Sequence, residues 1–186
     1  ETRCLAGQPY LEEIFLGLRL RIQPTTFFQV NTAQAESLVG LVLDQLDLQG
    51  NEIVIDTYCG IGTLSLPIAQ RAARCVGIES HAESVAQARQ NAALNGLKNT
   101  DFFAGAVEDL LLAISAQQAS PIDVVVLDPP RKGCDRAVLD ALVTIEPGRI
   151  VYMSCNPATL ARDLKVLCGH GYRLNLVQPA DFFPQT

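Results

Sequence analysis

The stretch Glu52–Ala69, EIVIDTYCGIGTLSLPIA, decides the fold that this sequence predicts. Its β-branched apolar run Ile53–Ile55 ends at Asp56, and two glycines, Gly60 and Gly62, come before an apolar segment with helical spacing. This succession predicts a strand, a tight glycine turn and a helix. Such a turn brings backbone N–H groups and the positive end of a helix to the carboxyl edge of a sheet. Open α/β sheets bind nucleotide-like ligands at this edge.

The residues around this turn favour a ligand with a ribose and a positive charge over a dinucleotide. Ser65 stands where the dinucleotide pattern G-x-G-x-x-G has its third glycine. Asp56 precedes the glycines, and Glu79 ends the next apolar run, near the spacing at which an acidic side chain accepts hydrogen bonds from ribose hydroxyls. We therefore expect S-adenosylmethionine as the ligand. The alternative is an ordinary βα turn with its carboxylates in water.

Length and composition predict one α/β domain. The chain has 186 residues, of which 48% are hydrophobic, and no apolar run approaches the roughly twenty residues of a membrane span. It begins at Glu1 without a signal-peptide pattern, so we expect a piece of a longer, cytoplasmic protein. The net charge of −6 is a poor basis for nucleic-acid binding, so RNA affinity would need a local basic patch or another part of the protein.

The cysteines indicate a reducing compartment. They are scattered without a C-x-x-C pair, which argues against zinc, an iron–sulfur cluster or a disulfide framework in this chain. The six are Cys4, Cys59, Cys75, Cys134, Cys155 and Cys168.

The first 31 residues predict a small β-hairpin extension, and residues 32–186 the main domain. Apolar residues alternate with Arg19 and Arg21 after a turn near Gly17, as in a half-exposed strand. The segment Phe27–Asn31 follows, with both phenylalanines expected as core anchors and Asn31 or Thr32 as the N-cap of a helix that reaches Leu46. These structural roles leave Gln29 unexplained.

Strands and helices alternate regularly after residue 52, which predicts a doubly wound, mostly parallel sheet with right-handed crossovers. The predicted strands lie near residues 52–56, 74–78, 100–104, 122–127, 149–153 and 172–178. The predicted helices lie near residues 63–71, 81–95, 107–118, 135–143 and 157–168.

Two strand ends carry candidate chemistry. The apolar run Val124–Leu127 stops at Asp128, and the two prolines that follow fix this carboxylate at the same edge as the glycine turn. The run Ile150–Met153 is followed by Cys155 at the start of a helix, a position that favours a thiolate nucleophile. Cys59 in the glycine turn is a weaker rival. A Cys–His hydrolase is disfavoured because neither histidine is placed near this edge.

Four segments resemble, in their order, the motifs of the RNA 5-methyluridine methyltransferase family. They are Phe27–Asn31, Asp56–Gly62, Asp128–Gly133 and Ser154–Pro157, and the likeness covers nearly the whole chain. The resemblance implies a class I, Rossmann-like methyltransferase domain with Cys155 as the nucleophile. It also implies that Gln29, Tyr58, Glu79 and Asp128 contact S-adenosylmethionine, that Gly60 belongs to the same cofactor site and that Asp128 approaches the target base.

The implied chemistry is methyl transfer to carbon 5 of a uridine in ribosomal or transfer RNA. A thiolate that adds to carbon 6 makes carbon 5 nucleophilic, and a base must later remove the carbon-5 proton. Family members carry this base as a glutamate beyond a motif resembling Asp181–Thr186, so we expect the present chain to lack it. We also expect a metal-free monomer whose RNA is bound largely by a domain absent from this chain.

Three other functions stay open at this point. An amino-group nucleobase methyltransferase usually has an aromatic residue after the Asp-Pro-Pro step, where this chain has Arg131. A catalytically silent S-adenosylmethionine- or RNA-binding module would share the same motifs. A nicotinamide-dependent oxidoreductase is disfavoured because the third glycine is missing.

Overall fold

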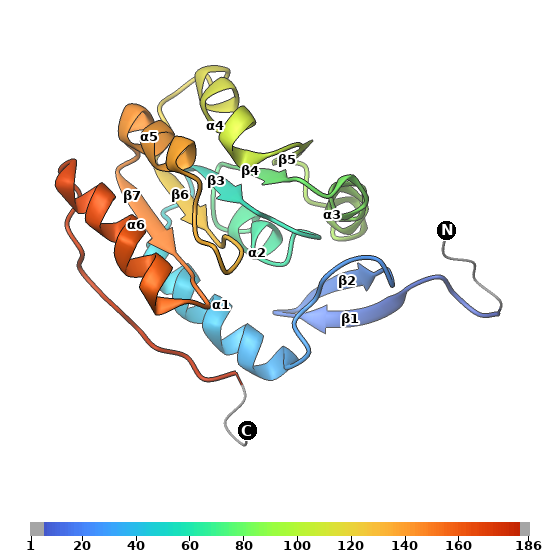
Figure 1. Ribbon diagram of the computed structural model, residues 1–186. Helices are drawn as coiled ribbons and strands as arrows, with labels where there is room; N and C mark the ends of the chain where they lie inside the picture. Colours follow the sequence, from blue (N-terminus) through green and yellow to red (C-terminus); the bar gives the residue numbers. More distant parts are fainter. Residues whose placement is uncertain (1–5, 183–186) are drawn as a thin grey trace.

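The computed structural model describes residues 6–182 and has a parallel sheet between two layers of helices (Figure 1). Cys4 and the end of the motif at residues 181–186, from residue 183 onward, lie outside the described residues. The strands of the sheet are β3 (Ile53–Thr57), β4 (Arg74–Glu79), β5 (Thr100–Ala104), β6 (Val124–Leu127) and β7 (Arg149–Tyr152). The helices are α1 (Thr32–Leu46), α2 (Ser65–Ala69), α3 (Ala82–Leu94), α4 (Val107–Ala116), α5 (Arg136–Ile145) and α6 (Pro157–Gly169).

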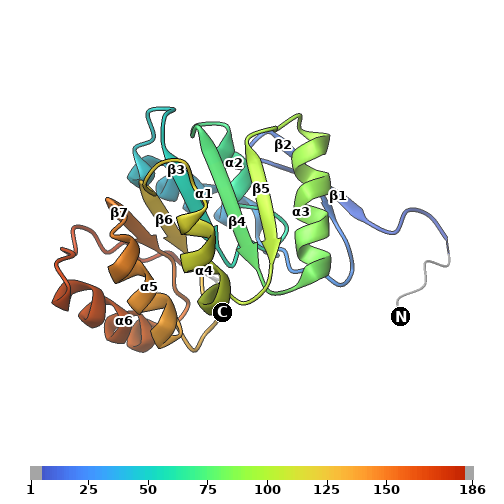
Figure 2. The ribbon, with the colours of Figure 1, turned by 90° about the horizontal axis from the view of Figure 1, so that it is seen from above.

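The strand order is β5-β4-β3-β6-β7, and all four neighbouring pairs are parallel (Figure 2). The chain first builds β3, β4 and β5 outward in one direction and then crosses back to place β6 on the other side of β3. The switch point therefore lies between β3 and β6, and ligands bind outside the carboxyl ends of the strands at such a point. The predicted doubly wound sheet is confirmed.

Two apolar cores cover the two faces of the sheet. One core packs α1, α2 and α3 against the side chains of Val54 and Val126, and the other packs α4, α5 and α6 against those of Ile55 and Val125. Successive strand residues point to opposite faces, so a run such as Val124–Leu127 contributes to both cores. This burial on both faces explains why the central strands read as continuous apolar runs.

The predicted hairpin is present as β1 (Leu11–Phe15) and β2 (Leu18–Ile22). Phe15 is fully buried and meets the ring of Phe28 edge-on, with ring centroids 5.9 Å apart. The expectation that Phe27 is also a core anchor is wrong, because 73% of this residue is exposed. Only Phe28 packs against the core.

The predicted strand over residues 172–178 is not formed. Its alternating apolar residues are exposed, with Leu174 at 50% and Leu176 at 52%. A strand needs a neighbour for its backbone hydrogen bonds, and within residues 6–182 the strand β7 pairs only with β6 and leaves its other edge open. The segment after α6 instead runs back along the outside of the molecule toward the start of α1 (Figure 1).

The predicted helix over residues 63–71 shortens to α2, because the chain is still in a turn at residues 60–64. Among residues 6–182, no helix combines the length and the apolar character needed to cross a membrane.

Candidate active site

A cavity opens at the switch point between β3 and β6, and four of the five predicted cofactor residues line it. They are Gln29, Tyr58, Gly60 and Asp128. The rest of the wall is mainly apolar and comes from α1, the glycine turn, the segment before α1, the residue after β7 and the end of the described chain. It includes Phe28, Leu38, Val39, Leu64, Met153 and Phe182.

Glu79, the fifth predicted cofactor residue, joins this site through the glycine turn. Its Oε2 accepts a 3.2 Å hydrogen bond from the backbone N–H of Gly60, and its Oε1 accepts a 2.7 Å hydrogen bond from the backbone N–H of His81. The two bonds fix the carboxylate at the end of β4, beside the turn. Tyr58 opens the turn with a φ of 63°, a left-handed conformation that is uncommon outside glycine and is often found at functional sites.

Asp56 lies beneath the cavity and is 1% exposed. Its Oδ2 accepts a 2.5 Å hydrogen bond from the hydroxyl of Ser65, the residue that replaces the third glycine of a dinucleotide motif. Burial raises the pKa of Asp56 to about 7, and the negative charges of Asp128 and Glu79 act in the same direction. The sequence did not reveal this hydrogen bond, because the sequence pattern identified Ser65 only as the residue that replaces the third glycine of a dinucleotide motif.

Asp128 stands at the mouth of the cavity, directly after β6. The residue reaches solvent, but the protein atoms packed around the mouth desolvate its carboxyl group and raise its pKa to about 6. The carboxyl groups of Asp56 and Asp128 line the cavity, and that of Glu79 lies beside the glycine turn that forms part of its wall. This concentration of carboxyl groups favours a cationic ligand, because a positive charge would relieve the repulsion between them.

Cys155 lies at the same edge of the sheet as Asp128 but does not line the cavity. The parallel pair β6–β7 sets Leu127 beside Tyr152, and the backbone N–H of Met153 donates a 2.8 Å hydrogen bond to the carbonyl of Leu127. Cys155 follows two residues later, exposed, directly before the N-cap residue Asn156 of α6. The predicted position before a helix is confirmed, and the role of Cys155 as nucleophile stays a prediction.

The rival thiol, Cys59, is poorly suited to attack a substrate. It is buried, and burial together with the nearby carboxylates of Asp56 and Glu79 raises its pKa well above the ordinary value. The fully buried Cys75 behaves in the same way. A thiol that stays protonated is a weak nucleophile, so Cys155 is the better candidate.

The loop after β6 is tied to α6 by a set of contacts that the sequence did not reveal. Fully buried Asp163 accepts hydrogen bonds at Oδ2 from the backbone N–H of Cys134, at 2.9 Å, and from the hydroxyl of Tyr152, at 2.7 Å. Its Oδ1 pairs with the neighbouring Arg162, whose guanidinium also donates to the carbonyls of Lys132 and Cys134. We call this group, Tyr152, Arg162, Asp163 and the loop residues Lys132–Cys134, the loop clamp. It holds the segment after Asp128 against the helix that follows Cys155.

One further contact brings distant parts of the chain to the cavity. The side-chain amide of Asn31 caps α1 and also donates a 3.1 Å hydrogen bond to the carbonyl of Phe182. The segment that contains Gln29 and the end of the described chain therefore meet at the cavity mouth. The sequence left Asn31 and Thr32 as alternative caps, of which Asn31 is the one observed, and gave no signal for Phe182.

A sequence model of the family described as tRNA (uracil-5-)-methyltransferase matches residues 16–186. The chain belongs to this family. Two curated relatives of this uracil-5-methyltransferase domain are uncharacterized RNA methyltransferases, from Gloeobacter violaceus at 58% identity over 186 residues and from Nostoc sp. at 54% over 187 residues. The chain is covered completely in both comparisons, and it spans 39% and 40% of the length of these relatives.

One solved structure agrees with the family assignment, and a second shares the fold alone. The tRNA (uracil-54, C5)-methyltransferase of Pyrococcus abyssi, determined with S-adenosyl-L-homocysteine, matches 87% of the chain with a TM-score of 0.76 and 32% identity, and 38% of that protein is covered. A precorrin-8w decarboxylase of Methanobacterium thermoautotrophicum matches with a TM-score of 0.64 at 21% identity. The match covers 75% of the present chain and 73% of the decarboxylase chain. The second likeness concerns the fold alone.

Proposed function

We propose that this chain binds S-adenosylmethionine and transfers its methyl group to carbon 5 of a uridine in RNA through a covalent bond between Cys155 and carbon 6. One observation carries the proposal: the pairing of β6 with β7 sets Asp128 and Cys155 at one edge of the sheet, next to the cavity that Asp128 lines. Membership of the uracil-5-methyltransferase family supports the same reaction.

The residues at the switch point fit the cofactor in chemistry. The wall offers apolar side chains, the amide of Gln29 and carboxyl groups that suit a sulfonium and an ammonium charge. Glu79 would accept hydrogen bonds from ribose hydroxyls, as acidic residues at this position do in nucleotide-binding sheets. The cavity holds about 90 Å³, less than the ~300–1,000 Å³ of typical small-molecule sites. A nucleoside-sized ligand would therefore extend along the open edge on which Gly60 and Glu79 stand.

In the proposed mechanism the thiolate of Cys155 adds to carbon 6 of the uracil ring, and the electron pair of the carbon 5–carbon 6 double bond moves to carbon 5 and the neighbouring carbonyl. S-Adenosylmethionine, when bound, supplies the methyl group that carbon 5 accepts. A base then takes the carbon-5 proton, the double bond re-forms and the thiolate leaves. Asp128 lies at the cavity mouth, where it can orient the target base beside the cofactor.

RNA carrying 5-fluorouridine tests this mechanism, because carbon 5 then has no proton for the base to remove. The 186-residue chain, incubated with S-adenosylmethionine and a short single-stranded RNA of this kind, should form a complex that survives denaturing electrophoresis. The complex should be lost in Cys155→Ala and kept in Cys59→Ala, the buried cysteine that serves as the matched control.

RNA binding by each variant, measured under native conditions, separates failure of chemistry from failure of binding. A stable adduct in Cys155→Ala would contradict the assignment of the nucleophile. An adduct that forms equally well without S-adenosylmethionine and carries no methyl group would contradict the proposed transfer.

A further inference from the structure

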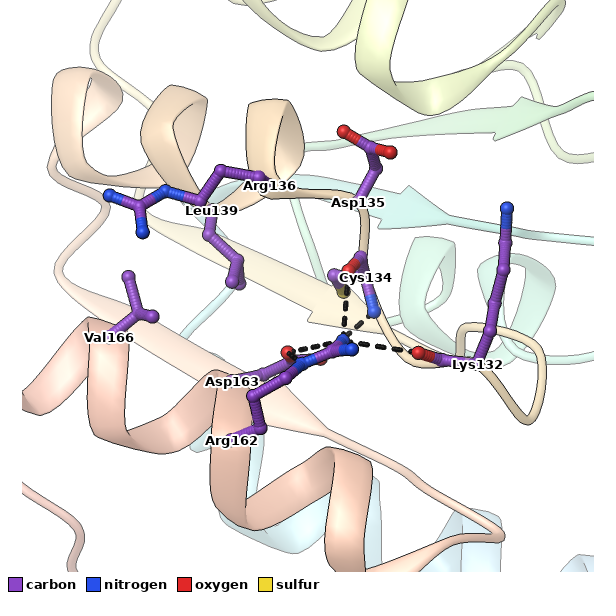
Figure 3. A pocket seen from close by; sticks show the side chains of 8 residues that line it. All are labelled: Lys132, Cys134, Asp135, Arg136, Leu139, Arg162, Asp163 and Val166. Carbon is purple, nitrogen blue, oxygen red and sulfur yellow. Dashed lines mark hydrogen bonds and ion pairs between the residues drawn. The ribbon is translucent and has the colours of Figure 1, made fainter.

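A second and larger depression, of about 410 Å³, lies on the other side of the loop after β6, between α5 and α6 (Figure 3). Lys132 of the loop, Arg136 of α5 and Arg162 of α6 line it. We call this depression the basic groove. It does not share a lining residue with the cavity at the switch point.

We propose that the basic groove binds the phosphodiester backbone of a single-stranded RNA segment that flanks the target uridine. The proposal rests on the proposed function for the identity of the RNA, and it assigns a contact surface that the uridine chemistry itself does not require.

The charge around the groove is opposite to that of the chain as a whole. The chain carries a net charge of −6. Three basic residues line the groove, Lys132, Arg136 and Arg162. Only two acidic residues, Asp135 and Asp163, line it, and Asp163 is fully buried against the loop. A local basic patch of this kind attracts phosphate in a protein that otherwise repels it.

Lys132 and Arg136 can reach a phosphate, whereas the guanidinium of Arg162 is bound to Asp163 and to the carbonyls of Lys132 and Cys134. Lys132 is exposed and has no acidic partner among the described residues. Arg136 pairs with Asp140 at 2.8 Å, but both side chains are more than half exposed, so the pair contributes little and opens readily. The carboxylate of Asp135 is occupied as the N-cap of α5, where it accepts from the backbone N–H of Ala137 at 3.0 Å.

The arrangement of the cations fits a strand better than a single small anion. Lys132 and Arg136 extend at opposite sides of the groove, with the guanidinium of Arg162 between them (Figure 3). One small anion would be met by cations converging on a point, whereas a nucleic-acid strand presents one phosphate per nucleotide along its length.

The groove begins next to the proposed nucleophile. The carbonyl of Arg131 accepts hydrogen bonds from the side chains of Asn156, at 3.2 Å, and Thr159, at 3.4 Å, and Cys155 directly precedes Asn156. A uridine whose base reaches Cys155 therefore places its neighbouring nucleotides near this loop. The target base must be unstacked to react, which favours a single strand over a duplex.

The test compares two double variants with equal charge changes. Lys132→Gln with Arg136→Gln removes two groove cations, and Arg71→Gln with Lys98→Gln removes two exposed cations near the starts of β4 and β5, at the opposite edge of the sheet.

Binding of a fluorescent single-stranded oligouridylate is measured by anisotropy between about 0.05 and 0.2 M salt. The groove variant should bind about 25-fold more weakly at 0.1 M salt, with a salt slope lower by about 1.4, because each lost phosphate contact removes about 0.7 from the slope. The control variant should change affinity by less than about threefold.

Equal losses in the two variants, or no binding by the unmodified chain up to about 10⁻⁴ M, overturn the proposal. Tighter binding of a duplex of the same length also overturns it. Methyl transfer to the same oligonucleotide is measured in parallel. If methyl transfer occurs but the groove variant binds RNA as tightly as the unmodified chain, only the proposed role of the groove is refuted. If the groove variant binds RNA more weakly but no methyl group is transferred, the uridine chemistry is refuted and the groove remains an RNA-binding surface.

Discussion

The side-chain Oδ2 of Asp163 accepts a 2.9 Å hydrogen bond from the backbone N–H of Cys134, which lies 29 positions earlier in the chain. This bond joins α6 to the loop that follows Asp128. Cys155 directly precedes the N-cap residue of α6, so the bond ties the segment after Asp128 to the helix that follows Cys155. The loop clamp therefore holds together the two segments that carry Asp128 and Cys155.

Replacing Asp163 should destabilise the protein strongly. Asp163→Ala removes a fully buried carboxylate and leaves the N–H of Cys134 and the hydroxyl of Tyr152 without their acceptor. We expect a loss of about 3 kcal/mol in the free energy of unfolding, measured in urea. Asp140→Ala, which breaks the exposed pair with Arg136, should cost less than about 1 kcal/mol. Similar losses in both variants would contradict a special role for Asp163.

Two glycines with nearly the same backbone conformation give a second comparison. Gly133 has φ +78°, and a Cβ there would lie 2.6 Å from Oδ2 of Asp163, whereas Gly17 has φ +77° and nothing within 4 Å. Gly17→Ala should therefore cost about 1 kcal/mol from backbone strain alone. Gly133→Ala should cost about 3 kcal/mol, because overpacking against the loop clamp adds to the strain. Thermal and urea unfolding of both variants measure the difference, and equal costs would show that the loop yields freely.

The raised pKa of Asp56 predicts a pH dependence of stability. The ordinary pKa of 3.8 applies to the unfolded chain, and the folded value is about 7. Between these values the folded protein keeps a proton that the unfolded chain has released, so stability falls as the pH rises from about 4 to about 7. Below that window both states are protonated, and above it both are ionised. The unmodified chain should therefore lose about 2 to 4 kcal/mol more than Asp56→Asn across the window.

Ser65→Ala provides the control for this pH effect. The hydroxyl of Ser65 donates to the carboxylate of Asp56 and lowers its pKa, against the larger effect of burial. Without this bond the window should extend to a higher pH than in the unmodified chain. Urea unfolding at a series of pH values measures both variants. Parallel pH profiles for the unmodified chain and Asp56→Asn would remove Asp56 as the cause.

The proposed cofactor role of Glu79 predicts a loss of ligand affinity. Glu79→Gln keeps the size of the side chain but removes the charge that would strengthen hydrogen bonds from ribose hydroxyls. We expect S-adenosylmethionine to bind about 1.5 to 3 kcal/mol more weakly in calorimetric titration. Glu83→Gln, an exposed carboxylate in the first turn of α3, is the matched control and should bind normally. An unchanged affinity in folded Glu79→Gln would exclude Glu79 from the site.

The sequence by itself determined the alternation of the elements and the edge of the sheet at which chemistry-bearing residues gather. The run Glu52–Ala69 predicted β3, its glycine turn and a following helix, and the structure contains all three, although α2 begins only at Ser65. Parallel strands end at one edge, so Asp128 and Cys155 could be placed together from the ends of two apolar runs. These predictions succeeded because periodicity and turn residues act over a few neighbouring positions.

Only the tertiary structure decided how separate elements meet at that edge. The contact of Asn31 with Phe182 spans 151 positions, and the bond from Cys134 to Asp163 spans 29, so neither leaves a local pattern. The alternation near Leu174 was a sound local signal for a strand, but within residues 6–182 this segment pairs with no strand, although the outer edge of β7 is open. A strand is completed by hydrogen bonds to another segment, and a buried carboxylate by donors from elsewhere in the fold. The local sequence therefore specified which residues are available, and the packing of distant segments decided which of them are joined.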